Sequence, residues 1–110
     1  MPFVVNLGGE GEEPGALNQQ DGVCVGPHWR VARTGETFAE AVRRGPPFLI
    51  CPNDALALPD GCADAVVSNH VPVGGGTGLG RAGIVPAEVA RILRPGGTWT
   101  HDGVPRFRKP

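Results

Sequence analysis

The sequence predicts an α/β fold with a mostly parallel sheet and few short helices. Short runs of apolar, strand-forming residues alternate with short amphipathic helical segments, which is typical of strand–helix–strand units. The 18 glycines and 12 prolines together make 30 of the 110 residues, which excludes long helices, coiled coils and helical bundles. Polar residues follow three of the predicted strands, as in sheets whose ligands bind at the strand ends.

The first two strands are predicted to be short and close together in the chain. Residues 3–7, Phe-Val-Val-Asn-Leu, form a run of strand formers that stops at a glycine pair, and residues 18–20 read as a short extended piece. About six residues separate Gly11 from Asn18, whereas a helical crossover needs roughly a dozen or more. We therefore expect that the usual first helix of such a sheet is absent or reduced to a turn.

The first helix is predicted at residues 37–44. Phe38, Ala41 and Val42 stand at i, i+3 and i+4, and the segment ends at Gly45, a good helix stop. Residues 48–51, an apolar run between prolines, predict a buried strand.

The second half of the chain continues the alternation. Residues 64–69 predict a core strand, and a turn over residues 58–61 precedes it. A helix is predicted after Pro86 over residues 87–94, with Val89, Ile92 and Leu93 facing inward.

The chain ends soon after the predicted fifth strand at residues 98–100. Residues 105–108 read as one more extended piece, and we expect no room for the antiparallel hairpin that normally completes such a sheet. The glycine-rich residues 74–83 follow the fourth strand, and are interpreted either as a lid that orders on substrate binding or as a plain linker.

Length and charge limit the classes of function. A chain of 110 residues predicts one domain over residues 1–110, and a net charge of -1 argues against binding to nucleic acid or a membrane surface through bulk charge. Only Arg106, Arg108 and Lys109 form a basic cluster. The sequence shows neither a signal peptide nor an apolar run near 18 residues, so a soluble cytoplasmic protein is expected. Because so small a domain buries a limited core, a homodimer or fusion to a larger polypeptide is also expected.

The cysteines and histidines do not predict a metal site. Cys24, Cys51 and Cys62 are odd in number and form no C-x-x-C pair, which indicates a reducing compartment and structural thiols. The three histidines are dispersed at unrelated spacings. We therefore expect no metal.

Four segments, in this order, resemble the motifs of the class I S-adenosylmethionine-dependent methyltransferases. Residues 4–11 look like the first-strand and glycine-turn motif, and residues 54–61 and 63–70 look like the family's "DAxxLPxxDxSFDxVxSxxxL" run. Residues 88–97 are similar to its "E-x-x-R-V-L-K-P-G-G" helix and turn. The resemblance implies a small Rossmann-like sheet, S-adenosylmethionine as cofactor and methyl transfer as the reaction.

The resemblance also implies a cofactor site. The acidic residue that usually binds the ribose hydroxyls falls at Gln20, with Asp21 one position later. The glycines have an alternative role as a tight strand-end turn, and Glu10 and Glu12 are interpreted either as substitutes for the missing acid or as solvated loop residues. The implied cofactor-binding residues are Gly8, Gly9, Gly11, Gln20, Asp54 and Ala55.

Asn69 and His70 are the candidate catalytic residues. They stand at the end of the fourth predicted strand, where transfer would occur, and a histidine can accept a proton near neutral pH. The alternative is that His70 is a structural hydrogen-bonding residue. His101, followed by Asp102, is a further candidate for the same crevice, whereas Trp29 and Trp99 are expected to serve packing.

A second resemblance concerns the opening of the chain and its Lys-Pro end. Both look like the methyltransferase-like C-terminal domains of bacterial polymorphic toxins of the Rhs type. This resemblance implies a toxin effector domain, delivered into a target cell and bound by an immunity protein. Three hypotheses thus stand: a minimal methyltransferase whose acceptor is unknown, such a toxin domain, and a degenerate binding module without catalysis.

Overall fold

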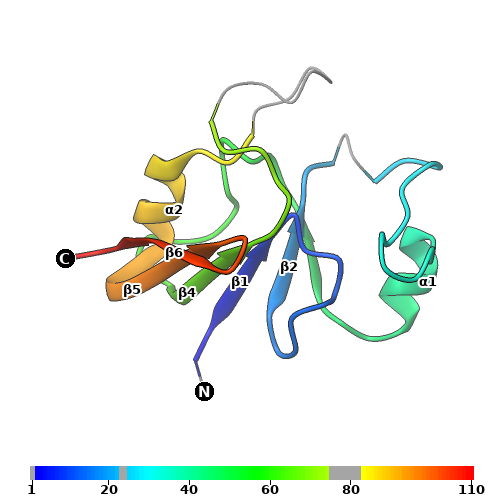
Figure 1. Ribbon diagram of the computed structural model, residues 1–110, viewed down its shortest axis with the longest axis horizontal. Helices are drawn as coiled ribbons and strands as arrows, with labels where there is room; N and C mark the ends of the chain where they lie inside the picture. Colours follow the sequence, from blue (N-terminus) through cyan, green and yellow to red (C-terminus); the bar gives the residue numbers. More distant parts are fainter. Residues whose placement is uncertain (1, 23–24, 75–82) are drawn as a thin grey trace.

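The computed structural model describes residues 2–22, 25–74 and 83–110 (Figure 1). The strands and both helices expected from the sequence are confirmed, with bounds that differ by a few residues. The elements are β1 (Val4–Leu7), β2 (Leu17–Gln20), α1 (Phe38–Arg43), β3 (Phe48–Ile50), β4 (Ala63–Ser68), α2 (Pro86–Ile92), β5 (Leu93–His101) and β6 (Val104–Arg108).

All the strands belong to one sheet in the order β3-β2-β1-β4-β5-β6. Every neighbouring pair is parallel except β5 and β6, which confirms the predicted α/β class. The chain runs from β1 toward one edge through β2 and β3 and then returns to the other side of β1 with β4. In such sheets the ligand site lies at the carboxyl ends of the strands where the order reverses.

The connection between β1 and β2 contains no helix. Residues 8–16 form turns and bends, as the short spacing predicted. The carboxyl end of β1 is therefore followed by a compact glycine turn.

Local sequence explains both helices. Thr37 and Glu40 form a capping box at the start of α1, each side chain bonded to the other residue's backbone N–H. Pro86 opens α2, where the missing N–H costs nothing, and Val89 and Ile92 are buried. The sequence prediction placed Leu93 in the helix, whereas it begins β5 and is fully buried there.

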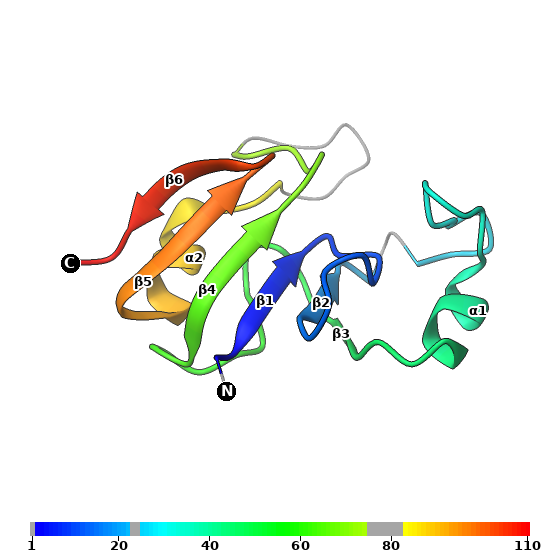
Figure 2. The ribbon, with the colours of Figure 1, turned by 60° about the horizontal axis from the view of Figure 1, so that its bottom comes forward.

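The main core lies between the sheet and α2. Val5 and Val66, paired on β1 and β4, are fully buried together with Val89 and Ile92 of α2. Trp99 of β5, 1% exposed, is the largest side chain of this core. Figure 2 shows α2 behind β4 and β5.

A smaller aromatic cluster holds α1 at the opposite edge of the sheet. The Phe38 ring of α1 lies 5.1 Å from the Phe48 ring of β3 and 5.3 Å from the Trp29 ring, all three in edge-to-face contacts. This cluster fixes the segment that follows β2.

The extended piece predicted at residues 105–108 is confirmed as β6, a single strand after β5. β6 pairs antiparallel with β5, with His101 opposite Val104. The two linking residues, Asp102 and Gly103, both have positive φ, 49° and 77°. An Asp-Gly pair with two positive φ angles is typical of a two-residue hairpin turn whose twist matches that of the strands. Only two residues are therefore needed to connect β5 to β6.

The prediction of a buried strand at residues 48–51 is also corrected. β3 is an edge strand with Ile50 43% exposed, although the following Cys51 is buried. Most of the glycine-rich segment 74–83, interpreted above as lid or linker, lies outside the described residues. Its two ends meet, since the Gly74 N–H donates to the Ile84 carbonyl.

No helix in the described part of the chain is long and apolar enough to cross a membrane. Residues 2–22, 25–74 and 83–110 contain no cluster of three or more histidine, cysteine or acidic side chains suited to a metal ion. Cys51 and Cys62 are free thiols, and burial raises the pKa of Cys62. Cys24 lies outside the described residues.

Candidate functional site

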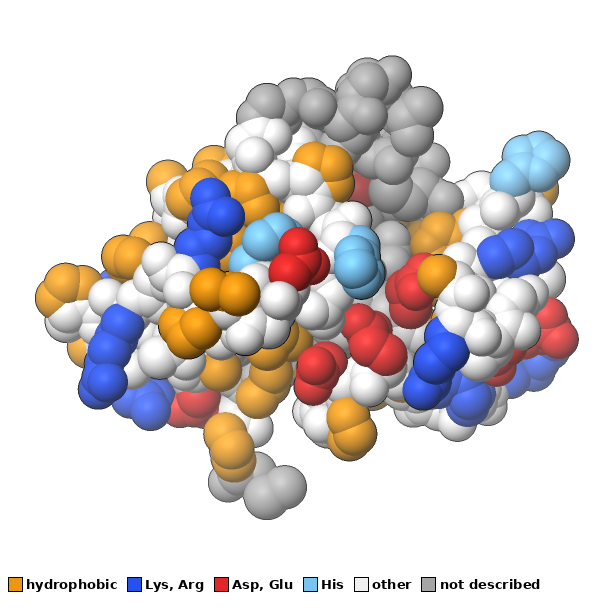
Figure 3. All heavy atoms as spheres, viewed as in Figure 1, with side chains coloured by type: hydrophobic (Ala, Val, Ile, Leu, Met, Phe, Trp, Pro, Cys, Tyr) orange, Lys and Arg blue, Asp and Glu red, His pale blue; other side chains and the backbone are white. Residues whose placement is uncertain are grey.

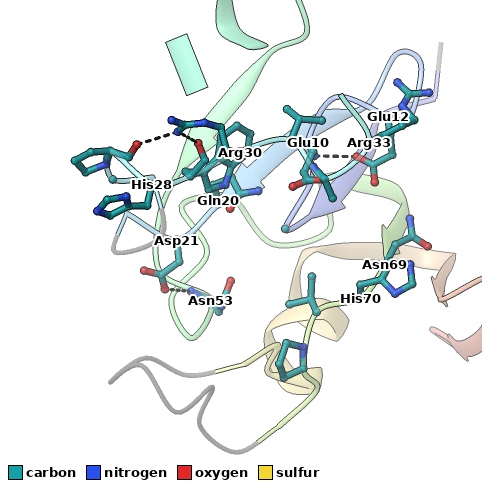
Figure 4. Close-up of a pocket in the computed structure, with 18 residues that line it drawn as sticks. Glu10, Glu12, Gln20, Asp21, His28, Arg30, Arg33, Asn53, Asn69 and His70 are labelled. Atoms are coloured by element: carbon teal, nitrogen blue, oxygen red, sulfur yellow. Dashed lines mark hydrogen bonds between the residues drawn. The ribbon is translucent and has the colours of Figure 1, made fainter. Parts of the chain in front are cut away.

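A cavity of about 1140 Å³ lies at the carboxyl ends of β1, β2 and β4. One wall comes from the residues that directly follow these strands, and residues 26–33 form the other wall. Figure 4 shows Asp21 and Asn53 on one side of the cavity and Asn69 and His70 on the other. Small-molecule sites usually measure about 300–1,000 Å³, so this cavity has room for a nucleoside-sized ligand and a second small molecule.

Amide side chains of β2 hold the glycine turn beside the cavity. The Asn18 Oδ1 accepts from the Gly11 N–H at 3.0 Å, and the Gln19 Oε1 accepts from the Gly8 N–H at 3.2 Å. The Gln20 Nε2 donates to the Gly9 carbonyl at 2.9 Å. Gln20 thus lines the cavity, and its amide nitrogen is committed to the turn.

Gly8 is the glycine of this turn that lines the cavity. Its φ is +67°, and a Cβ placed on it would lie 2.3 Å from Cγ2 of Val71, another lining residue. Gly9 and Gly11 stand in the same turn outside the lining. Both steric fit and backbone conformation therefore require glycine at position 8.

Replacing Gly8 by alanine is expected to destabilise the protein more than the same change at Gly15. Gly15 also has a positive φ, +78°, but a Cβ there meets nothing within 4 Å, so it reports backbone strain alone. We expect a loss of roughly 1 kcal/mol for Gly15→Ala and about 2–3 kcal/mol for Gly8→Ala, measured by urea unfolding. Equal losses in the two variants would show that the contact with Val71 costs nothing.

Two glutamates of the turn line the cavity with opposite shifts of pKa. Burial raises the pKa of Glu10. Burial of Glu12 acts in the same direction, but hydrogen bonds from backbone N–H groups and from the Asn6 and Asn69 side chains outweigh it and lower its pKa. Glu12 is therefore a fixed carboxylate, and Glu10 is the more readily protonated one.

Asp21 is the carboxylate that follows β2 in the cavity. It is 8% exposed, and its Oδ2 accepts from the Asn53 N–H at 3.4 Å. The Asn53 Oδ1 in turn accepts from the Gln19 Nε2 at 3.0 Å, which ties the ends of β2 and β3 together. Asp54 and Ala55, the predicted cofactor residues, are exposed and lie outside the lining, whereas Asn53 belongs to it.

Asn69 and His70 both line the cavity. His70 is exposed and has a φ of 59°, which is uncommon for a residue with a side chain. Its N–H donates to the Asp102 Oδ1 at 2.6 Å. In Figure 3, histidine and acidic side chains gather near the middle of the visible face.

Ser68, His101 and Asp102 form a series of polar contacts beneath this turn. The Ser68 Oγ lies 2.7 Å from the His101 Nδ1, and the His101 Nε2 lies 3.3 Å from the Asp102 Oδ2. Ser68 is fully buried, and its Oγ also accepts from the Trp99 Nε1 at 2.9 Å. A buried hydroxyl cannot reach a substrate, so this series is structural and does not form a nucleophile.

The sequence analysis missed the second wall of the cavity, residues 26–33. His28, Trp29, Arg30 and Arg33 all line it. The segment has no helical or strand periodicity, and the Trp29 contacts with Phe38 and Phe48 place it. The only local signal was a cluster of basic and aromatic residues without a predicted element.

The fold is a small Rossmann-like α/β sheet with a cavity at the carboxyl ends of its parallel strands. No protein-family model and no curated protein matches the sequence. Among solved structures, the chain is similar to a chain of the complex between the Haloferax volcanii Trm112 methyltransferase activator and a candidate methyltransferase. The TM-score is 0.54 at 22% identity, over 89% of this chain and 43% of the other. The likeness concerns the fold, and this chain spans less than half the length of its neighbour.

Proposed function

We propose that the domain binds S-adenosylmethionine in the cavity and serves methyl transfer to a small acceptor. The observation that supports this most is the position of the cavity, which lies where the strand order reverses and is lined there by Gly8, Asp21 and His70. The methyltransferase-type fold agrees with it.

The residues present fit such a cofactor. A buried carboxylate at the end of β2 suits the two hydroxyls of a ribose, and Asp21 is that carboxylate. Asn53 beside it would meet the base, and the Gly8 turn offers a close approach to the backbone. When bound, S-adenosylmethionine supplies a methyl group carried on a sulfonium sulfur.

The chain's own residues would orient the acceptor and take its proton. Holding an acceptor in line with the methyl group provides much of the acceleration in such reactions. His70 stands at the cavity, and an unprotonated ring nitrogen of His70 would accept the proton that the acceptor loses. Asn69, whose side chain is bonded to Glu12, would orient the acceptor.

Calorimetric titration with S-adenosylmethionine and S-adenosylhomocysteine tests the proposal. Micromolar binding with a matching rise in melting temperature supports it, since a ligand of the native state stabilises that state. No binding at millimolar concentrations would overturn it. The toxin effector and the non-catalytic module would then be the next hypotheses to test, the former through growth arrest on expression.

Asp21→Asn is expected to weaken S-adenosylhomocysteine binding about tenfold while the melting temperature of the free protein stays within a few degrees. The change keeps the shape of the side chain and removes the charge that strengthens hydrogen bonds to hydroxyls. Asp54→Asn is the matched comparison. The sequence motif predicts that it too weakens binding, whereas its exposed position outside the lining predicts no change. Unchanged affinity in Asp21→Asn would remove Asp21 from the site.

A further inference from the structure

The Asn69–His70 turn has no stabilising element of its own. It follows β4 directly, and the next regular element in the described residues is α2. His70 is exposed and adopts a left-handed backbone conformation that a residue with a Cβ rarely holds without an external constraint. Some group outside the turn must therefore keep it in place.

Glu12 bonds the Asn69 side chain, and Asp102 constrains the His70 backbone from the hairpin turn after the neighbouring strand. The Asp102 Oδ1 accepts the His70 N–H at 2.6 Å, and the Asp102 N–H donates to the Ser68 carbonyl at 2.8 Å. The two bonds join the ends of β4 and β5 on both sides of Asn69. A charged acceptor at this distance makes a stronger bond than a neutral one.

The Asp102 carboxylate is itself connected to the core through His101 and Ser68. Its Oδ2 lies 3.3 Å from the His101 Nε2, and the His101 Nδ1 lies 2.7 Å from the Ser68 Oγ. Ser68 also accepts from the buried Trp99 indole. The series therefore runs from the core to the cavity wall, and the His70 N–H lowers the pKa of Asp102.

We propose that Asp102 is a positioning residue that fixes the Asn69–His70 turn at the cavity, through its bond to the His70 N–H. The importance of this turn for ligand binding rests on the proposed function. The bond itself does not depend on it. Asp102 acts from outside the cavity lining, so its effect on a ligand is exerted through His70.

Two substitutions separate the carboxylate from the hairpin turn that carries it. Asp102→Asn keeps an acceptor oxygen, and Asp102→Gly removes it. Both Asn-Gly and Gly-Gly suit the two-residue turn, so both variants preserve the β5–β6 hairpin. A difference between them thus reports the bond to His70.

Amide hydrogen exchange measured by NMR on the full chain tests the proposal. In Asp102→Gly the His70 amide is expected to exchange about tenfold faster, and in Asp102→Asn within about threefold of the wild type. The Asp64 amide, bonded to the Phe3 carbonyl near the other end of β4, is the control and should not change. Equal exchange of the His70 amide in Asp102→Gly and the wild type would overturn the proposal.

Binding of S-adenosylhomocysteine provides the second measurement. A loosened turn must be ordered again by the ligand, so we expect at least threefold weaker binding in Asp102→Gly and recovery in Asp102→Asn. If Asp102→Gly binds as tightly as the wild type, the turn does not position the ligand site. If no variant binds, the proposed function fails, and the exchange rates still decide the role of Asp102.

Discussion

Replacement of Trp99 by alanine is expected to lower the free energy of unfolding by about 3–5 kcal/mol. Trp99 is 1% exposed and is the largest side chain in the core between the sheet and α2. Its loss leaves a cavity that cannot close, because β5 is paired with a strand on each side. The change also removes the indole N–H that donates to Ser68. In a domain of this size such a loss is a large part of the total stability.

Urea unfolding followed by circular dichroism measures this loss of stability, and two further variants serve as comparisons. Trp99→Phe keeps most of the apolar volume and loses the indole N–H, so a loss of about 1–2 kcal/mol is expected. Phe107→Ala is the control, because Phe107 pairs with Trp99 across the β5–β6 hairpin but is 38% exposed. A loss below about 1 kcal/mol in Trp99→Ala would show that the core does not depend on this residue.

Arg91→Ala is expected to cost about 2–3 kcal/mol. Arg91 joins α2 to the irregular segment between β3 and β4. Its guanidinium donates to the Leu56 and Leu58 carbonyls, each at 2.8 Å, and to the Glu88 carboxylate at 2.8 Å. The Glu88 Oε1 also accepts from the Leu56 N–H, so the variant leaves several partly buried acceptors without a donor.

Two comparisons test whether the geometry of the guanidinium or only its charge matters. Arg91→Lys keeps the charge but not the planar fork, and an intermediate loss is expected. Arg94→Ala removes an arginine that is 51% exposed and paired with Asp64, and a loss below about 1 kcal/mol is expected. Equal stability of Arg91→Ala and Arg94→Ala would contradict the structural role of Arg91.

The Arg91–Glu88 pair also predicts a dependence on pH. The bond to Arg91 lowers the pKa of Glu88 below its ordinary value of 4.5. The unfolded chain then binds the proton more readily, so the contribution of the pair is present above about pH 4.5 and is lost as the pH falls through the lower folded value. The difference in stability between wild type and Arg91→Ala should therefore shrink on acidification.

Local patterns in the sequence predicted most of the fold. The apolar spacing and the Gly45 stop of α1, and Pro86 of α2, act within a few residues of chain, so their effect can be recognised without a structure. The exposure of β3 depends on its place at the edge of the sheet, and no local sequence pattern predicts the strand order. The β5–β6 hairpin did have a local signal, the Asp102-Gly103 pair, and the prediction overlooked it.

The candidate site was predicted less completely. Gln20 ends β2, and Gly8, Asn69 and His70 follow strands, so the parallel sheet brings all four to one cavity. Residues 26–33 were missed because the Trp29 contacts with α1 and β3 position them, and such contacts between distant segments leave no periodic pattern. The cofactor role of Asp54 and Ala55 stays a prediction, although neither lines the cavity.

The amide side chains of β2 have a consequence for the conditions under which the cavity keeps its shape. In the usual arrangement a helix begins after the glycine turn, and its terminal dipole is weakened by salt. Here Asn18, Gln19 and Gln20 hold the turn through neutral groups that neither gain nor lose protons. These bonds should therefore keep their geometry over a wide range of ionic strength, and over acidity down to the lowered pKa of Glu12, whose carboxylate accepts from the Glu10 N–H in the same turn.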